Sequence, residues 1–105
     1  MKNMEELYQA ISNNKTDNLT LLDVRTPEEF NEGHIEKAIN IPHDQITETE
    51  IVKLRDHNKL VVFCRMGGRA SFAGQILAAS GLDPVIIDEN GMAYWYEQNY
   101  PVTSF

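Results

Sequence analysis

The sequence contains a single cysteine, Cys64, and has no apolar stretch long enough to span a lipid bilayer. A lone cysteine excludes a disulfide within the chain and a zinc site built from four cysteines, and a free thiol is typical of a reducing compartment. The first residues, 1–6, also lack the apolar core of a signal peptide. Together these absences predict a cytoplasmic protein with no membrane segment.

Basic residues are also scarce. The chain has 9 lysines and arginines against 16 aspartates and glutamates, which gives a formal net charge of -7. Because the nucleic-acid backbone attracts a basic protein face, this balance argues against a nucleic-acid partner. The sequence shows no repeat or linker, and 105 residues suffice for one ordinary hydrophobic core. We therefore expect one domain over residues 1–105.

Helical and strand-like patterns alternate along the whole chain. Thr26, Pro27 and Glu29 combine an N-cap, a proline in the first turn and a capping box, and Thr47 with Glu50 predicts a second box. Strands that are apolar throughout and separated by helices predict an α/β fold, an open parallel sheet of about four to five strands with helices on both faces. The apolar runs typical of such strands occupy residues 19–24, 38–41, 59–63 and 84–87.

A functional site of such a sheet is expected at one edge. Ligands of open parallel sheets bind beyond the carboxyl ends of the strands. Two of the predicted strands lead into polar or reactive side chains, one into Asp23 and Arg25 and the other into Cys64. We expect these two strand ends to lie on the same rim of the sheet.

Cys64 ends an apolar strand and opens a loop that leads into an alanine-rich helix. Successive backbone N–H groups and a helix N-terminus attract an anion, so this place favours the thiolate over the thiol. A cysteine at the end of an apolar strand is more often inert core, and that interpretation competes with a nucleophile. The residues that follow decide between the two.

Five residues follow the cysteine in the predicted loop: Arg65, Met66, Gly67, Gly68 and Arg69. The two glycines can adopt positive φ, which lets the backbone wrap tightly around an anion. The two arginines add permanent positive charge, and no acidic residue occurs anywhere between positions 56 and 83. A local positive field in an acidic chain favours a small anionic ligand, and therefore a nucleophilic cysteine.

Several ordered blocks of the sequence, at residues 22–30, 33–42, 64–69 and 91–95, resemble those of the rhodanese family of single-domain sulfurtransferases. The loop pattern of that family, a cysteine followed by glycine three residues later and arginine five residues later, is met by Cys64, Gly67 and Arg69. Lys37 and Asn90 depart from the family pattern, in which glycine is common at both positions. Both departures concern turns outside the cysteine loop.

This resemblance implies a two-step sulfur transfer through a Cys64 persulfide, without a cofactor. The donor would be a small anion such as thiosulfate or a persulfide, and the acceptor a thiol or a sulfur-relay partner protein. The implied substrate-binding residues are those of the loop, with Arg69 assigned to anion binding and to holding the loop, and Arg65 to steering the donor. The loop N–H groups would stabilise charge on the terminal sulfur, and Met66 and Phe72 are expected at the pocket mouth.

Other polar residues receive structural interpretations. Asp23 and Arg25 are expected to support the site by tying loops together through charge-assisted hydrogen bonds, rather than to act on the substrate. His34 is interpreted as a packing residue rather than a proton donor. His43 and His57 lack the spacing typical of metal ligands, so we expect surface positions and no metal site.

Two other functions remain open from the sequence. One is a cysteine phosphatase or arsenate reductase, but Cys64 and Arg69 enclose only four residues, and Ala70 occupies the position where the longer phosphatase loop needs its arginine. The other is a rhodanese-like module that carries sulfur or binds a partner without turnover of its own. The intact cysteine is compatible with a carrier as well as with an enzyme.

Overall fold

The computed structural model describes residues 1–104 and contains one sheet of parallel strands. The strands are β1 (Leu19–Asp23), β2 (Ile39–Asn40), β3 (Lys59–Phe63) and β4 (Val85–Ile86). The sheet is 4-stranded with the order β2-β1-β3-β4, so β1 and β3 are the central strands. The predicted α/β fold with an open parallel sheet is confirmed, and each of the predicted strands is present, with β2 and β4 shorter than expected.

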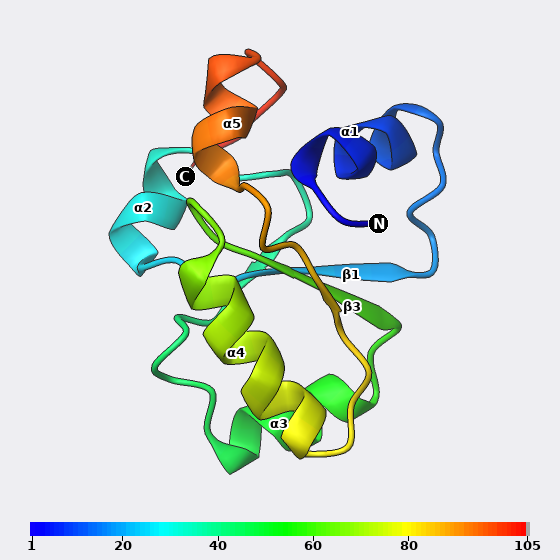
Figure 1. Ribbon diagram of the computed structural model, residues 1–105, viewed down its shortest axis with the longest axis vertical. Helices are drawn as coiled ribbons and strands as arrows, with labels where there is room; N and C mark the ends of the chain where they lie inside the picture. Colours follow the sequence, from blue (N-terminus) through cyan, green and yellow to red (C-terminus); the bar gives the residue numbers. More distant parts are fainter. Residues whose placement is uncertain (105) are drawn as a thin grey trace.

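Helices cover both faces of this sheet (Figure 1). Figure 1 shows α1 and α5 above the strands, α3 and α4 below them, and α2 beside the strand ends. This arrangement follows from the parallel order of the strands. Each connection must return along one face of the sheet before the next strand begins, and helices form most of these connections. The helices span Met4–Ser12 (α1), Pro27–Glu32 (α2), Glu48–Arg55 (α3), Gly68–Ala79 (α4) and Met92–Glu97 (α5).

The hydrophobic core is divided by the sheet into two layers. Because side chains alternate along a strand, Val62 and Cys64 belong to the layer under α3 and α4, while Val61 and Phe63 belong to the layer under α1 and α5. Trp95 is buried in the second layer, where it is 1% exposed. The alternation therefore fixes which face of the sheet receives the cysteine.

The helix starts differ from one another in how they are capped. At α2, the predicted capping box is present: Thr26 Oγ1 accepts a hydrogen bond from Glu29 N, and the Glu29 carboxylate accepts one from Thr26 N. At α3, Thr47 is the N-cap residue but its side chain makes no capping bond, so the prediction of a second box is wrong. The α3 helix ends at Arg55, with Asp56 as its C-cap residue.

The two departures from the family pattern have different structural consequences. Lys37 has a φ of 74°, in the left-handed region where glycine is favoured, which accounts for the glycine common at this position in the family. Asn90 has no such backbone requirement; its side-chain oxygen accepts a hydrogen bond of 2.9 Å from Met4 N at the start of α1. Neither residue belongs to the cysteine loop.

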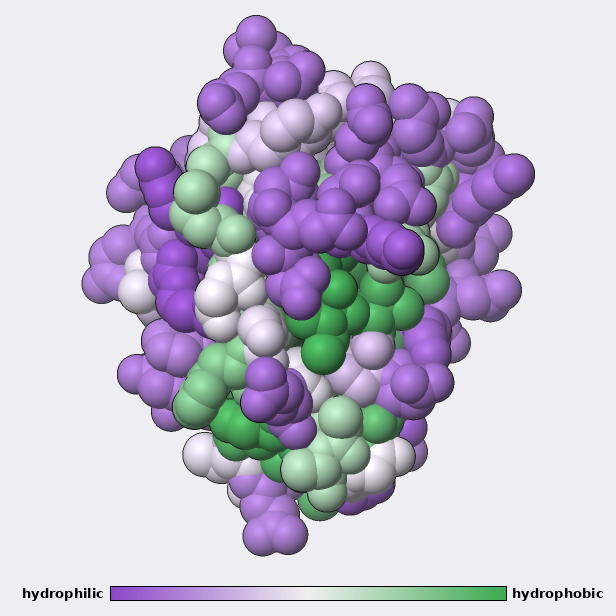
Figure 2. Space-filling model, viewed as in Figure 1, coloured by the Kyte–Doolittle hydropathy of each residue, from purple (hydrophilic) through white to green (hydrophobic). Residues whose placement is uncertain are grey.

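Hydrophilic side chains cover most of the face shown in Figure 2, with a hydrophobic area near its middle, over the sheet. Among residues 1–104, no helix has the length and apolar character needed to cross a membrane. Among the same residues, no group of three or more His, Cys, Asp or Glu side chains is placed to hold a metal ion.

Candidate functional site

The carboxyl ends of β1 and β3 lie side by side, as predicted. The register of the two parallel strands pairs Asp23 with Phe63. The chain leaves β1 toward Arg25 and leaves β3 toward Cys64, so both groups of candidate residues are at the same rim of the sheet. This rim is the edge at which open parallel sheets bind their ligands.

The Cys64 sulfur sits at the start of α4. Its side chain is 1% exposed, and Sγ accepts hydrogen bonds from Gly67 N at 3.1 Å and from Ala70 N at 3.3 Å. The helix has no side-chain cap of its own, and among residues 1–104 the N–H groups of Gly68 and Arg69 have no acceptor. Such free donors at a helix N-terminus attract negative charge, so this end of α4 is suited to an anionic ligand.

The carbonyl groups of the loop are bound on its other side, by α5. Met92 N donates to the Cys64 carbonyl at 2.8 Å, and Ala93 N donates to the Arg65 carbonyl at 3.1 Å. A Cβ atom at Gly91 would overlap both of these carbonyl groups, so the close approach of α5 to the loop requires glycine there. Because its carbonyls are held away, the loop presents N–H groups rather than carbonyl oxygens to the sulfur.

The two loop glycines play different parts. Gly67 has a φ of 119°, and a Cβ atom there would overlap the backbone carbonyl of Asp88. Gly68 is the first residue of α4, is absent from the positive-φ positions, and has open space where a Cβ would be placed. The expectation that both glycines use positive φ is therefore wrong for Gly68, because the helix begins there.

Arg69 is paired with Glu29 of α2. Its guanidinium group donates two hydrogen bonds to the carboxylate, Nη1 to Oε1 at 2.6 Å and Nη2 to Oε2 at 3.0 Å. The hydrogen bonds from Arg69 lower the pKa of Glu29 from 4.5 to about 2. The pair joins the first turns of α2 and α4, which supports the expected role of Arg69 in holding the loop, while direct anion binding by Arg69 stays a prediction.

Sequence reasoning found Glu29 only as a member of the capping box and missed this pairing. The order of the predicted elements could have revealed it, since α2 follows β1 and α4 follows β3. Each follows the carboxyl end of a central strand, so their first turns are neighbours on the same rim. An acidic residue in one first turn and an arginine in the other are then within reach of each other.

The remaining loop side chains face solvent. Arg65 and Met66 are exposed, Met66 by 68%, and Phe72 of α4 is also 54% exposed. The Phe72 ring contacts the ring of His43 edge to face, with centroids 5.8 Å apart. An exposed cation and large exposed apolar groups beside the cysteine loop fit the expected positions of these residues at the mouth of the site.

Asp23 and Arg25 form a buried ion pair beside the loop. Their side chains are 0% and 1% exposed, and Arg25 Nη2 lies 2.9 Å from Asp23 Oδ2. Arg25 also donates to the Gly33 carbonyl at 2.9 Å and to the Tyr96 hydroxyl at 3.0 Å, and the same hydroxyl donates to Gly33 O. These bonds join β1, the end of α2 and α5, which is the geometry of a supporting role.

His34 and His57 contact residues outside the cysteine loop. His34 is buried, stacks on Phe30 with ring centroids 3.7 Å apart, and has its Nδ1 at 2.8 Å from the Phe30 carbonyl oxygen. His57 Nδ1 lies 3.4 Å from the Thr20 hydroxyl, near the opposite end of β1. The interpretation of His34 as a packing residue agrees with its burial and its ring contact.

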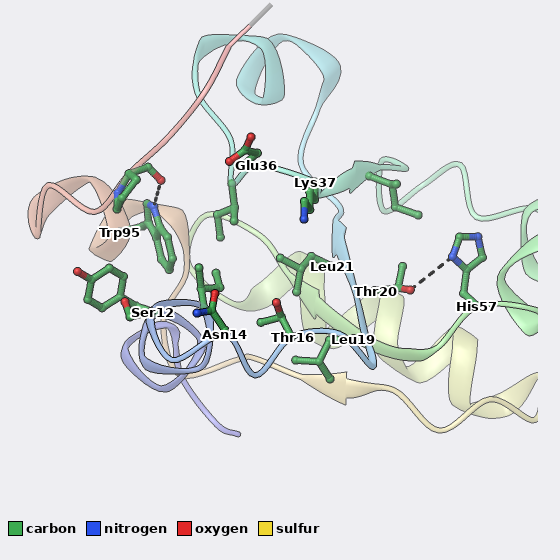
Figure 3. Close-up of a pocket in the computed structure, with 15 residues that line it drawn as sticks. Ser12, Asn14, Thr16, Leu19, Thr20, Leu21, Glu36, Lys37, His57 and Trp95 are labelled. Carbon is green, nitrogen blue, oxygen red and sulfur yellow. Dashed lines mark hydrogen bonds between the residues drawn. The ribbon is translucent and has the colours of Figure 1, made fainter.

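A separate cavity of about 610 Å³ lies on the α1 face of the sheet (Figure 3). Residues of α1, β1 and the segment 35–39 contribute to its walls, together with Trp95 and Pro101. None of the loop residues 64–69 lines it. The cavity and the cysteine are on opposite faces of the sheet, so the cavity is not part of the Cys64 site.

Comparison with known proteins identifies the family. The model of the rhodanese-like domain matches residues 3–98, nearly the whole chain. The chain therefore belongs to the rhodanese family, as the sequence blocks and the cysteine loop predicted.

Several relatives carry names that concern sulfur transfer. A sulfurtransferase of Allochromatium vinosum is 31% identical over 102 residues, which cover 95% of this chain and 91% of the relative. A thiosulfate sulfurtransferase of Shewanella oneidensis is 28% identical over 92 residues, with 87% and 89% covered. A putative sulfur carrier protein of Bacillus subtilis is 27% identical over 92 residues, but the match covers 88% of this chain and 48% of that protein.

Some relatives are longer than this chain. The chain spans about half the length of the first curated relatives that it matches, among them a senescence-associated protein of radish, 33% identical over 92 residues and covered to 50%. Among solved structures, a rhodanese-related protein of Thermoplasma volcanium has a TM-score of 0.79 and 37% identity, with 96% of this chain and 94% of that chain covered. The family is thus shared over residues 3–98, and the fold over 96% of the chain.

Proposed function

We propose that this chain is a sulfurtransferase that carries sulfane sulfur as a Cys64 persulfide, from a small anionic donor such as thiosulfate to a thiol acceptor. One observation carries the proposal. The Cys64 sulfur accepts hydrogen bonds from the N–H groups of Gly67 and Ala70, at the uncapped start of α4. Free N–H donors beside a nucleophilic sulfur stabilise negative charge both on the thiolate and on a sulfur atom added to it.

In the first step, the Cys64 thiolate attacks the outer sulfur of thiosulfate. A Cys64 S–S bond forms while the bond between that sulfur and the sulfonate group breaks, and sulfite leaves with the bonding electron pair. The product is a Cys64 persulfide anion, so charge is conserved and no oxidant is needed. The relay divides one difficult transfer into two easier ones, which is the general advantage of covalent catalysis.

In the second step, an acceptor thiolate attacks the terminal sulfur of the persulfide. A new S–S bond forms on the acceptor, the bond to Cys64 breaks, and the Cys64 thiolate is regenerated. Because the chain has only 1 cysteine, no second thiol of the same chain is present to resolve the persulfide as a disulfide. Turnover therefore requires an outside thiol or a partner protein.

The side chains around the sulfur take supporting roles in this proposal. Arg65, exposed at the mouth, steers the anionic donor by its charge. Met66 lies at the same mouth, and Gly67 and Gly68 supply backbone N–H groups. Arg69 holds the first turn of α4 and adds charge near the bound anion. Neither step needs a cofactor, since the thiolate and the donor supply all electrons.

The proposal is tested by intact mass of the wild type and of Cys64→Ser after exposure to thiosulfate, followed by cyanide or a thiol. We expect the wild type to gain one sulfur atom and to lose it to the acceptor, and Cys64→Ser to gain none. If the wild type gains no sulfur from thiosulfate or from a persulfide donor, the proposed relay is wrong. Hydrolysis of a phosphomonoester that Cys64→Ser abolishes would instead support a phosphatase.

A sulfur carrier is the second candidate. The near-complete burial of Cys64 and the absence of a resolving thiol suit a sulfur that is held until a partner arrives, and the relative of Bacillus subtilis bears the name of a putative carrier. The two candidates differ in rate. Multiple turnover with a small thiol supports an enzyme, whereas a persulfide that is discharged only by a protein acceptor supports a carrier.

A further inference from the structure

Glu29 neutralises one of the two arginines of the Cys64 loop by pairing with it. Both amino groups of the Arg69 guanidinium group point to the two oxygens of the Glu29 carboxylate, at 2.6 and 3.0 Å. The charge of the loop arginine is therefore offset by an adjacent negative charge. Arg65 is the other loop arginine, and its side chain is exposed to solvent.

The carboxylate is held in place independently of Arg69. Glu29 Oε1 also accepts hydrogen bonds from Thr26 N at 3.1 Å and from Thr26 Oγ1 at 3.2 Å. Four donors thus converge on one carboxylate, two from the N-cap residue Thr26 and two from Arg69. A carboxylate that is also bound by its own N-cap residue is better positioned than one held by an arginine alone.

Arg69 and the Ala70 N–H that donates to the sulfur belong to the same first turn of α4. Hydrogen bonding to Glu29 is the main cause that raises the pKa of the Arg69 guanidinium group, and the charge of Cys64 contributes in the same direction. In sequence, Arg69 precedes Ala70, whose N–H donates to Sγ. A change in the net charge of the Glu29 and Arg69 pair will therefore be felt by an anion bound at Cys64.

We propose that Glu29 is a specificity-determining residue that, by pairing with Arg69, lowers the positive charge at Cys64 and so favours sulfur donors with a single negative charge over dianions. This inference rests on the proposed function and goes beyond it, since it names the charge class of the preferred donor. Thiosulfate is a dianion, so we expect it to be a poorer donor than a sulfur donor that carries a single negative charge.

The experiment compares two donors of different charge on the wild type and on Glu29→Gln. Thiosulfate carries two negative charges and releases sulfite, whereas methanethiosulfonate carries one and releases methanesulfinate after the same attack by Cys64. The glutamine keeps the size of the side chain and its ability to accept a hydrogen bond, but frees the charge of Arg69. The donor ratio is kcat/KM for thiosulfate divided by kcat/KM for methanethiosulfonate. We expect this ratio to be about threefold to tenfold higher in Glu29→Gln than in the wild type.

A matched control is available on the same helix. Glu28 is exposed in the first turn of α2, and Glu28→Gln removes the same formal charge one residue away. We expect the donor ratio of this control to stay within about twofold of the wild type, because an exposed charge is screened. Thermal unfolding of each variant shows whether it is folded under the assay conditions.

Substitution of Arg69 supplies an independent arm that does not depend on the folding of Glu29→Gln. Arg69→Gln leaves the Glu29 carboxylate uncompensated, so the donor ratio should move against thiosulfate. The double variant Glu29→Gln/Arg69→Gln removes both charges, and its ratio should return toward the wild type. A merely structural role of Glu29 would instead lower kcat for both donors by the same factor.

The outcomes separate the two levels of the proposal. If the wild type forms a Cys64 persulfide with both donors, but the ratio is unchanged or falls in Glu29→Gln, Glu29 does not select by charge and the inference is overturned while the proposed function stands. If neither donor forms the persulfide in the wild type, the proposed function itself is wrong. A rise of the ratio in Glu29→Gln and its reversal in the double variant support the inference.

Discussion

Two helices begin at neighbouring strand ends of this protein, and their first turns are capped in different ways. In α2, the N–H of Glu29 donates to the hydroxyl of Thr26 at 3.2 Å. In α4, the N–H of Ala70 at the equivalent third position donates to the Cys64 sulfur at 3.3 Å. The acceptor in α2 belongs to the N-cap residue itself, whereas in α4 it comes from the residue after β3.

This difference separates a helix start that is capped by its own N-cap side chain from the helix start at which we propose the sulfur chemistry. The Thr26 hydroxyl accepts the hydrogen bond of Glu29 N within its own helix. In α4, the N-cap is Gly67, which has no side chain, so the sulfur of Cys64 takes the place of the capping oxygen. Because the donors there are backbone N–H groups of a helix start, an anionic sulfur is stabilised without any second catalytic side chain. The ion pair of Glu29 and Arg69 then joins the two starts.

Of the substitutions at the two helix starts, Gly67→Ala is expected to have the largest effect on stability and on sulfur transfer. The alanine Cβ would overlap the Asp88 carbonyl, and φ at this position is 119°. Strain and overlap together should lower the free energy of unfolding by about 2 to 4 kcal/mol. Sulfur transfer should fall as well, since Gly67 N is a donor to Sγ. Urea unfolding and the persulfide mass assay measure the two effects.

Gly68→Ala is the matched control for this substitution. Gly68 lies in the first turn of α4 with open space for a Cβ, so alanine should be neutral or should stabilise the helix by about 0.5 to 1 kcal/mol. Similar losses in the two variants would contradict the different roles assigned to the two glycines. A stable Gly67→Ala variant with full activity would do the same.

The parts of this site that sequence predicted are those fixed by local patterns. The capping box of Thr26 and Glu29 depends on residues three apart, and the strand of Cys64 depends on one apolar run. The box predicted at Thr47 failed although the residue types were equally suitable. A capping pattern therefore predicts where a helix starts more securely than it predicts which side-chain bonds form there.

The parts that sequence reasoning missed depend on contacts between distant segments. The pairing of Glu29 with Arg69 joins residues 40 apart. The bond from Met92 N to the Cys64 carbonyl joins the start of α5 to the cysteine loop, which come together only in the folded protein. The family resemblance included Gly91 in one of its sequence blocks but gave no physical reason for a glycine there. The structure supplies one, because only glycine allows α5 to approach the loop carbonyls.

The ion pair between the two helix starts should make stability depend on pH. Pairing with Arg69 lowers the pKa of Glu29 to about 2 in the folded protein, from 4.5. A carboxyl with a lowered folded pKa contributes stability that is complete above its unfolded pKa and is lost as pH falls through the folded value. We expect the difference in unfolding free energy between the wild type and Glu29→Gln to shrink by about 1 to 2 kcal/mol between pH 6 and pH 2.

Urea unfolding at several pH values tests this expectation, with Glu28→Gln as the control. The exposed Glu28 carboxylate forms no ion pair with the rest of residues 1–104, so the difference of this variant from the wild type should change much less with pH. A difference for Glu29→Gln that stays constant from pH 6 to pH 2 would mean that the pair does not stabilise the fold.

The smallest predicted effect compares two threonines that occupy the same position in different helices. Thr26 caps α2 with a hydrogen bond to Glu29 N, while Thr47 begins α3 without a side-chain capping bond. Thr26→Ala should therefore lower the free energy of unfolding by about 1 kcal/mol, and Thr47→Ala should change it by less than about 0.5 kcal/mol. Equal losses in urea unfolding would show that the hydroxyl of Thr47 caps its helix in solution. If only Thr26→Ala is destabilised, the capping bond itself, rather than the residue type, separates the two helix starts.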